Sequence, residues 1–161
     1  MPEVEEFLLG EFRRSLDERY RLSIPGELGD LLAAASPNCI LAKERPGCLS
    51  LWSAPLWQGR LDEGVELVKQ KMRAGKLQER IGEVQLFGRL LSTRHRRGQL
   101  AGRGRLVIPE GFREFLAVEP GGEVQIVGAA VCVEIWNPTA WLKYLEGRMP
   151  RFRRLFDQLS K

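Results

Sequence analysis

Two short segments of the chain have apolar residues at alternate positions. Leu22 and Ile24 flank the polar Ser23, and Leu106 and Ile108 have the same spacing of two further along. A period of two places such side chains on one face of a β-strand. A proline follows each pair and ends the strand, because proline has no N–H to donate to a sheet.

The two alternating segments belong to a tandem repeat. When residues 10–57 are shifted forward by 84 positions they fall on 94–141, and about a dozen of the aligned positions are identical. Such agreement without a gap indicates duplication. The matched pairs include Arg21 and Arg105, Pro25 and Pro109, Cys48 and Cys132, Trp52 and Trp136, and Trp57 and Trp141.

Each copy predicts the same order of elements: a strand, a tight turn, a second strand, a short helix, two more strands and the start of a helix. Ser53 and Asn137 stand where that last helix begins, and both are good N-cap residues. A module of this size is too small to bury a self-sufficient core. We therefore expect an α+β fold in which the two copies form a pseudo-twofold pair and share one sheet system.

A helical insert is predicted between the copies, over 58–93, with Gly75 breaking it into two helices. Its apolar stripe could pack on its own domain or form a subunit interface, and the short amphipathic helix at the C-terminal end leaves the same two alternatives. The stripe consists of Leu61, Val65, Val68 and Met72, followed by Leu77, Ile81, Val84 and Leu91.

Composition narrows the function classes. The single histidine, His95, excludes a multi-histidine metal site, and no nucleophile–base pair or paired-cysteine motif indicates an enzyme or a bound cofactor. The chain has 25 Lys+Arg and 21 Asp+Glu, a modest basic excess that fits a polyanionic partner. Neither a signal peptide nor a run of about 18 apolar residues is present, which predicts a soluble cytoplasmic protein with reduced thiols.

The segments "LDERYRLSIP" and "LAGRGRLVIP" resemble the turn-and-strand signature of the SpoVT-AbrB family, and two copies with a helical insert resemble the MraZ family. The resemblance covers residues 7–157. It implies two tandem swapped-hairpin modules, 7–57 and 94–141, which form an intramolecular pseudo-dimer β-barrel. A helical linker at 58–93 and a C-terminal helix at 142–161 complete the implied organisation.

For function, the resemblance implies a sequence-specific transcriptional regulator that binds double-stranded DNA. It further implies promoter repeats of a division and cell-wall gene cluster as targets, assembly into homo-oligomeric rings, and a place at the nucleoid. An antitoxin-like protein-interaction module of related fold is the alternative. The family's DNA-contacting positions carry over to Asp17 and Arg21 in the first copy and to Arg105 alone in the second, where Ala101 replaces the aspartate.

Basic residues cluster around both predicted turns, and arginine pairs bidentately with phosphate or guanine. We expect Arg21 and Arg105 to contact DNA, although a salt bridge from Arg21 to Asp17 or Glu18 is the competing role. The other predicted contacts are Arg13, Arg14, Arg19, Arg96, Arg97 and Arg103. Plain solvated surface is the alternative to phosphate contact for Arg13, Arg14, Arg94, Arg96 and Arg97.

The two turns differ in sequence. Asp17 should organise the first turn by accepting backbone N–H groups. The first copy has Tyr20 where the family pattern prefers glycine, and the second has Gly104. Because a bulky residue is costly at positive φ, the two turns are expected to differ in shape.

Overall fold

The computed structural model describes residues 6–161, except for the side chains of Ala35 and Arg103. The first copy forms β1 (Glu11–Ser15), β2 (Arg21–Ser23), α1 (Gly26–Ala35), β3 (Asn38–Arg45) and β4 (Cys48–Ser53). The second forms β5 (His95–Gln99), a 3₁₀ turn (Gly102–Gly104), β6 (Arg105–Val107), α4 (Arg113–Leu116), β7 (Glu123–Gly128) and β8 (Val133–Trp136). The predicted order of elements is thus present in both copies.

The strands of the two copies pair with one another. An antiparallel six-stranded sheet has the order β1-β7-β8-β4-β3-β5, so the first strand of each copy pairs with the other copy. β4 pairs with β8 at the centre, and β2 with β6 in a separate two-stranded ribbon. The α+β class is confirmed. The predicted closed barrel is not seen in the described part of the chain, because β1 and β5 are the two open edges of the sheet.

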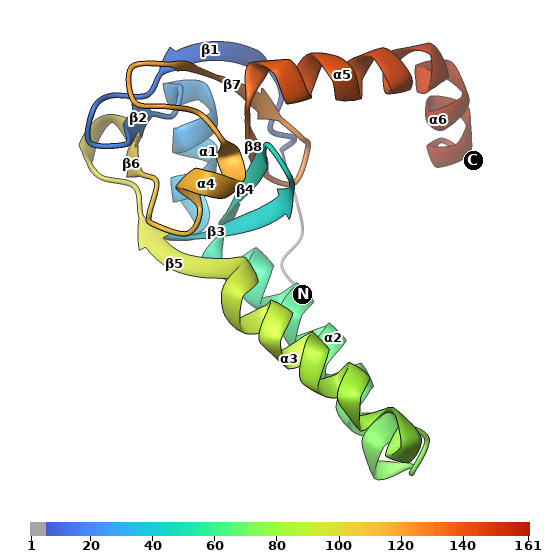
Figure 1. Ribbon diagram of the computed structural model, residues 1–161. Helices are drawn as coiled ribbons and strands as arrows, with labels where there is room; N and C mark the ends of the chain where they lie inside the picture. Colours follow the sequence, from blue (N-terminus) through green and yellow to red (C-terminus); the bar gives the residue numbers. More distant parts are fainter. Residues whose placement is uncertain (1–5) are drawn as a thin grey trace.

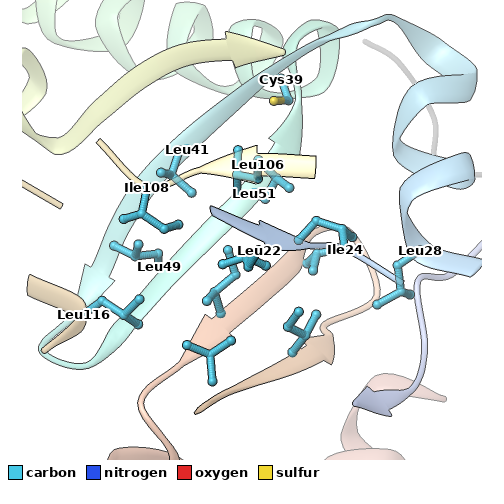
Figure 2. Close-up of a cluster of buried hydrophobic side chains, with 14 of the residues drawn as sticks. Leu22, Ile24, Leu28, Cys39, Leu41, Leu49, Leu51, Leu106, Ile108 and Leu116 are labelled. Atoms are coloured by element: carbon cyan, nitrogen blue, oxygen red, sulfur yellow. The ribbon is translucent and has the colours of Figure 1, made fainter. Parts of the chain in front are cut away.

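One apolar cluster joins the ribbon to the sheet (Figure 2). The ribbon contributes Leu22 and Leu106, which lie over the strands of the six-stranded sheet. Because both copies supply this core, neither copy has an apolar core of its own. Its buried members also include Leu16, Ile24, Leu28, Leu41, Leu49, Leu51, Ile108, Leu116, Val124, Ile126, Val133 and Ile135.

The other face of the sheet carries two tryptophan clusters, one for each copy. Trp52 and Trp57 lie at the junction of β4 with the helix that follows, and Trp136 and Trp141 lie at the matching junction after β8. All four side chains are buried, so the tryptophans are packing residues at these junctions. The three cysteines are also buried, and loss of solvation raises the pKa of the Cys132 thiol to about 12. These thiols are therefore unreactive packing groups.

The insert forms two long helices, α2 (Ala54–Arg73) and α3 (Ile81–Arg94), joined by a turn and a 3₁₀ segment (Gln78–Arg80). Gly75 has a φ of +74° in that turn, which confirms the predicted break. α2 begins at Ala54, directly after the predicted cap Ser53 and with Pro55 in its first turn, so the last helix of the first copy and the first helix of the insert are one element. The two helices lie side by side and extend away from the sheet (Figure 1).

The C-terminal segment contains two helices rather than one. α5 (Pro138–Arg148) begins on Asn137, whose side chain accepts the N–H groups of Thr139 and Ala140, whereas the Ser53 side chain makes no such bond. A 3₁₀ turn (Met149–Arg151) with Pro150 separates α5 from α6 (Phe152–Leu159). No helix in residues 6–161 is long and apolar enough to cross a membrane.

A carboxyl group lies within the sheet and gives stability a pH dependence. Glu134 of β8 stands opposite Ser50 and Val127, and loss of solvation raises its pKa above the ordinary 4.5. The indole N–H of Trp136 donates to Glu134 at 3.0 Å and opposes the shift. Burial nevertheless dominates, so the carboxyl holds its proton to a higher pH in the folded state than in the unfolded state.

We predict that Glu134→Gln stabilises the protein at neutral pH. As pH rises from 4.5 through the raised pKa, the native Glu134 binds more protons than the unfolded one, so the free energy of unfolding falls. Glutamine removes this fall and can still accept the Trp136 N–H. Urea unfolding of both proteins between pH 4.5 and 7.5 measures the difference, and parallel pH curves for the two would contradict the prediction.

Candidate nucleic-acid interface

The β2–β6 ribbon is built with one apolar and one polar face. Leu22 pairs with Leu106 at its centre, and both side chains are buried against the sheet. Because side chains alternate along a strand, the flanking residues face outward, and all of them are exposed. These outward residues are Arg21, Ser23, Arg105 and Val107. Arg21 pairs with Val107 and Arg105 with Ser23, so the two arginines are diagonal neighbours on one face.

Asp17 organises the turn that leads into β2. Its Oδ1 accepts the backbone N–H groups of Arg19 and Arg21, each at 2.8 Å. Its Oδ2 accepts the Nε–H of Arg21, also at 2.8 Å. These bonds, led by that from the Arg21 backbone, hold the pKa of Asp17 below its ordinary value. The carboxylate is therefore ionised at neutral pH and holds the Nε atom of Arg21 in place.

The second turn has the same main-chain frame without the carboxylate. Asp17 N–H donates to the Arg21 carbonyl at 2.9 Å, and Ala101 N–H donates to the Arg105 carbonyl at the same distance. In the second turn the Arg105 N–H, which has no carboxylate to bind, donates to the Ala101 carbonyl at 3.3 Å. A backbone carbonyl thus takes over one role of the missing aspartate.

The expectation that the turns differ in backbone shape is wrong. Tyr20 has a φ of +58° and Gly104 a φ of +70°, so both copies place this residue in the left-handed region. The carbonyls of both residues accept from the opposite copy: Ile108 N–H donates to Tyr20 at 2.8 Å and Ile24 N–H to Gly104 at 2.9 Å. The Arg113 guanidinium lies 4.0 Å from the centre of the Tyr20 ring. These contacts offset the cost of a bulky residue at positive φ.

Arg21 and Arg105 are each held through their own Nε atom. Arg21 Nε donates to Asp17, and Arg105 Nε donates to the Gly102 carbonyl at 3.3 Å. Within residues 6–161 the terminal nitrogens of both guanidinium groups make no hydrogen bond. The Arg21 side chain is 45% exposed despite its ion pair. The competing role predicted for Arg21, a salt bridge to Asp17, is thus present, and because it uses Nε it leaves the pair of terminal N–H₂ groups available.

Strand register divides the other arginines between the two faces of the sheet. Arg14 pairs with Val124 and Arg96 with Leu41, and both partners belong to the core beneath the ribbon. Arg14 and Arg96 thus lie on the ribbon side. Their neighbours Arg13 and Arg97 lie on the opposite face, where Arg13 is 3.6 Å from Glu123 and Arg97 pairs with Ile40. The structure does not bring all predicted arginines onto one surface.

The remaining basic residues of the two clusters have different positions. Arg19 is exposed in the first turn, and Arg103 occupies the matching place in the second, with its side chain outside the described residues. Arg94 and His95 lie at the base of the helical insert, where Arg94 is 3.4 Å from Glu44 and the His95 ring packs on Trp57 at 5.3 Å. They belong to a different surface from the ribbon.

Two outward residues of the ribbon escaped the sequence prediction. Ser23 and Val107 flank the arginines, and Val107 is 53% exposed. The alternation that predicted Leu22 and Leu106 as buried also predicts their neighbours as exposed, so the signal was present. Within residues 6–161 no group of three or more potential metal-ligating residues lies together.

Comparisons with known proteins match this arrangement to one family. The family model described as "MraZ protein, putative antitoxin-like" matches residues 98–157. A protein named transcriptional regulator MraZ from Heliobacterium modesticaldum is 28% identical over 151 residues, which cover 94% of this chain and 95% of that protein. The chain is similar to proteins of the MraZ family over most of its length.

Other MraZ relatives agree over similar lengths. The transcriptional regulator MraZ of Thermus thermophilus is 28% identical over 137 residues, covering 85% of this chain and 86% of its own length. That of a Nocardioides species is 26% identical over 150 residues, covering 93% and 94%. These matches include both copies of the repeat and the insert between them, so the MraZ likeness extends well beyond the single segment that the family model matches.

Proposed function

We propose that this chain is a transcriptional regulator of the MraZ family that reads double-stranded DNA with its β2–β6 ribbon. The observation that carries the proposal is the pair of arginines on the outward face, Arg21 and Arg105, each held at Nε with its terminal nitrogens available. The major groove of B-DNA admits a two-stranded ribbon, and a guanidinium pairs bidentately with guanine O6 and N7. The names of the relatives support a role in transcription.

The flanking positions supply affinity rather than sequence discrimination. Arg14 and Arg96 lie on the ribbon side of the sheet, Arg14 near the end of β1 that leads into the first turn and Arg96 near the start of β5, and Arg19 is exposed in the first turn. Phosphate contacts of this kind fix the register of a protein on the duplex without reading bases. The target proposed is a set of repeats upstream of the protein's own genes, in a division and cell-wall cluster, which would place the protein at the nucleoid.

We also propose that the two copies act as an intramolecular pseudo-dimer of swapped hairpins. The exchange of β1 and β5 between copies, and the crossed bonds from Ile24 to Gly104 and from Ile108 to Tyr20, support this organisation. Because the two copies contribute one strand each, the ribbon exists only when both fold together. The DNA-reading surface is then a product of the duplication and belongs to neither copy alone.

Binding to the upstream DNA should be specific and dependent on salt. The observed association constant should fall with a log–log slope of about −0.9 for each phosphate neutralised, and the specific site should exceed random duplex by about 10³-fold or more. Fluorescence anisotropy at several salt concentrations, with random duplex as competitor, measures both. If the upstream DNA gains no preference over random duplex, the regulator proposal fails and the antitoxin-like alternative takes its place.

The helices support self-association. α6 exposes Phe152, Leu155, Phe156 and Leu159, which share one face at helical spacing, and the insert exposes Leu67, Leu86 and Leu90. Unpartnered apolar surface of this extent marks an interaction site. We propose that α6 of one protein chain packs on the insert of the next chain. A contact between two different surfaces repeats head to tail, so it forms a ring where the rotation closes.

A double variant, Phe152→Ser with Phe156→Ser, should dissociate the oligomer. Light scattering behind size-exclusion chromatography should then give the 18.3 kDa mass of one chain, whereas the wild type gives a multiple of it. Gln158→Ala, a change at a polar position of the same helix, should leave the assembly intact. A wild type that is already monomeric at micromolar concentration would refute the proposed contact.

A further inference from the structure

A cavity of about 280 Å³ lies between the helical insert and the sheet, away from the ribbon. Its apolar walls come from Trp52 and Trp57, with further apolar side chains from both helices of the insert. Its polar lining residues are Glu44, Arg60, Arg94 and His95. The volume approaches that of sites that hold small organic molecules, and an apolar cavity with a few polar groups is their usual composition.

Two polar atoms at this cavity lack partners. The indole Nε1 of Trp57 and the Nδ1 of His95 are buried and make no hydrogen bond within residues 6–161. Trp57 is 7% exposed, and the matching indole in the second copy, that of Trp141, donates to Glu11 at 3.0 Å. A buried donor without an acceptor is costly and calls for an explanation. A ligand with an acceptor oxygen would supply one.

The charges around the cavity favour an anion. Glu44 already accepts the Ser50 hydroxyl at 2.6 Å and lies 3.4 Å from Arg94, so its charge is balanced. Arg60 lies 4.8 Å from the Trp52 ring centre and forms no ion pair within the described chain. The surplus is therefore positive, with an N–H donor beside it. The Arg94 guanidinium lies 5.6 Å from the centre of the Trp57 ring, and its Nε donates to the Lys43 carbonyl at 3.0 Å, so a ligand reaches the indole N–H only when the end of this side chain shifts.

We propose that this cavity binds a small planar organic anion, an aryl carboxylate in chemical class. Its ring packs between the tryptophans and the apolar residues of the insert, and its carboxylate accepts from Arg60 and from the Trp57 indole. The site is independent of the ribbon and of the proposed DNA binding, because none of its residues lies on the ribbon's outward face. No catalytic step is involved.

The single histidine makes the test direct. The His95 imidazole gives one set of NMR resonances in the full-length protein, and the Trp57 indole N–H adds a second reporter. Benzoate, 1-naphthoate and indole-3-acetate serve as probes, with neutral benzamide as the uncharged match for benzoate. We expect saturable shifts of both reporters with a carboxylate probe, and affinity about tenfold weaker for benzamide.

Two variants test the assigned contacts. Arg60→Gln should raise the Kd of the best carboxylate about tenfold, and Trp57→Phe, which keeps an aromatic ring and removes the N–H donor, should raise it severalfold. Arg89→Gln, an exposed arginine of the insert outside the cavity, should leave the Kd unchanged. The proposal is overturned if no carboxylate gives a saturable shift at probe concentrations of up to about 10 mM. Equal affinity for benzamide and benzoate, or an unchanged Kd in Arg60→Gln, also overturns it.

Discussion

Replacing both Arg21 and Arg105 with alanine should lower the affinity for the upstream DNA by at least about 30-fold and remove most of its preference over random duplex. A well-placed base contact contributes about 1–3 kcal/mol of discrimination, and 1.4 kcal/mol is a factor of ten. The two side chains share one exposed face and have no common partner within the described chain. Their effects should therefore be close to additive.

The anchoring of Nε is the physical reason to expect a large effect. A free arginine loses side-chain entropy when it binds, but Asp17 and the Gly102 carbonyl already fix part of each side chain. The two arginines should differ in one respect. Asp17 brings a negative charge next to Arg21, whereas Arg105 has Ala101 at the matching position. Loss of Arg105 should therefore reduce the salt slope at least as much as loss of Arg21.

Arg13 and Arg97 provide the matched control. They stand on the same edge strands as Arg14 and Arg96 but on the opposite face of the sheet. Replacing both with alanine removes the same charge and should change DNA affinity less than threefold, roughly the effect of a distant surface charge. Anisotropy titrations of the two double variants decide the matter, with circular dichroism as a check on folding. If the control pair weakens binding as much as the ribbon pair, the ribbon is not the reading surface.

The repeat made the elements predictable, because the pattern that specifies them is local. Leu22 and Ile24 reveal a strand by alternation, and Pro25 marks its end, so β2 and α1 follow from a few adjacent residues. The same 84-residue offset pairs Tyr20 with Gly104, and that alignment contained the signal for a shared left-handed turn. The general cost of a bulky residue such as tyrosine at positive φ instead predicted two turns of different shape. The contacts with Arg113 and Ile108 that outweigh them are tertiary.

Strand partners could not be predicted in the same way. Alternation places Arg13 and Arg14 on opposite faces of their strand, but only the pairing of β1 with β7, more than 100 residues away, shows that Arg14 is the one on the ribbon side. The apolar insert presents a similar problem. Its predicted stripe includes Met72 and Ile81, which are 43% and 54% exposed, because each helix is apolar on more than one face. A periodicity identifies the helices but not the face that a neighbour covers.

The two copies should unfold as one unit. Ile126 of β7 is fully buried and pairs with Phe12 in β1 of the first copy and with Ile135 in β8. Ile126→Ala should lower the free energy of unfolding by about 2–5 kcal/mol, the usual range for a large-to-small change in a core. The substitution lies in the second copy. Because β1 and β5 are exchanged and the core is shared, the first copy should lose the same amount of unfolding free energy.

The tryptophan pairs report on each copy separately. A protein with Trp136→Phe and Trp141→Phe retains only the first-copy indoles, and one with Trp52→Phe and Trp57→Phe retains only those of the second. Ile126→Ala should shift the urea midpoint by the same amount in both backgrounds, because a single cooperative transition has one midpoint. Leu142→Ala, a change at an exposed position, should alter stability by less than about 0.5 kcal/mol. A shift confined to the second-copy reporter would show two independently folding modules and would remove the basis for a ribbon that requires both.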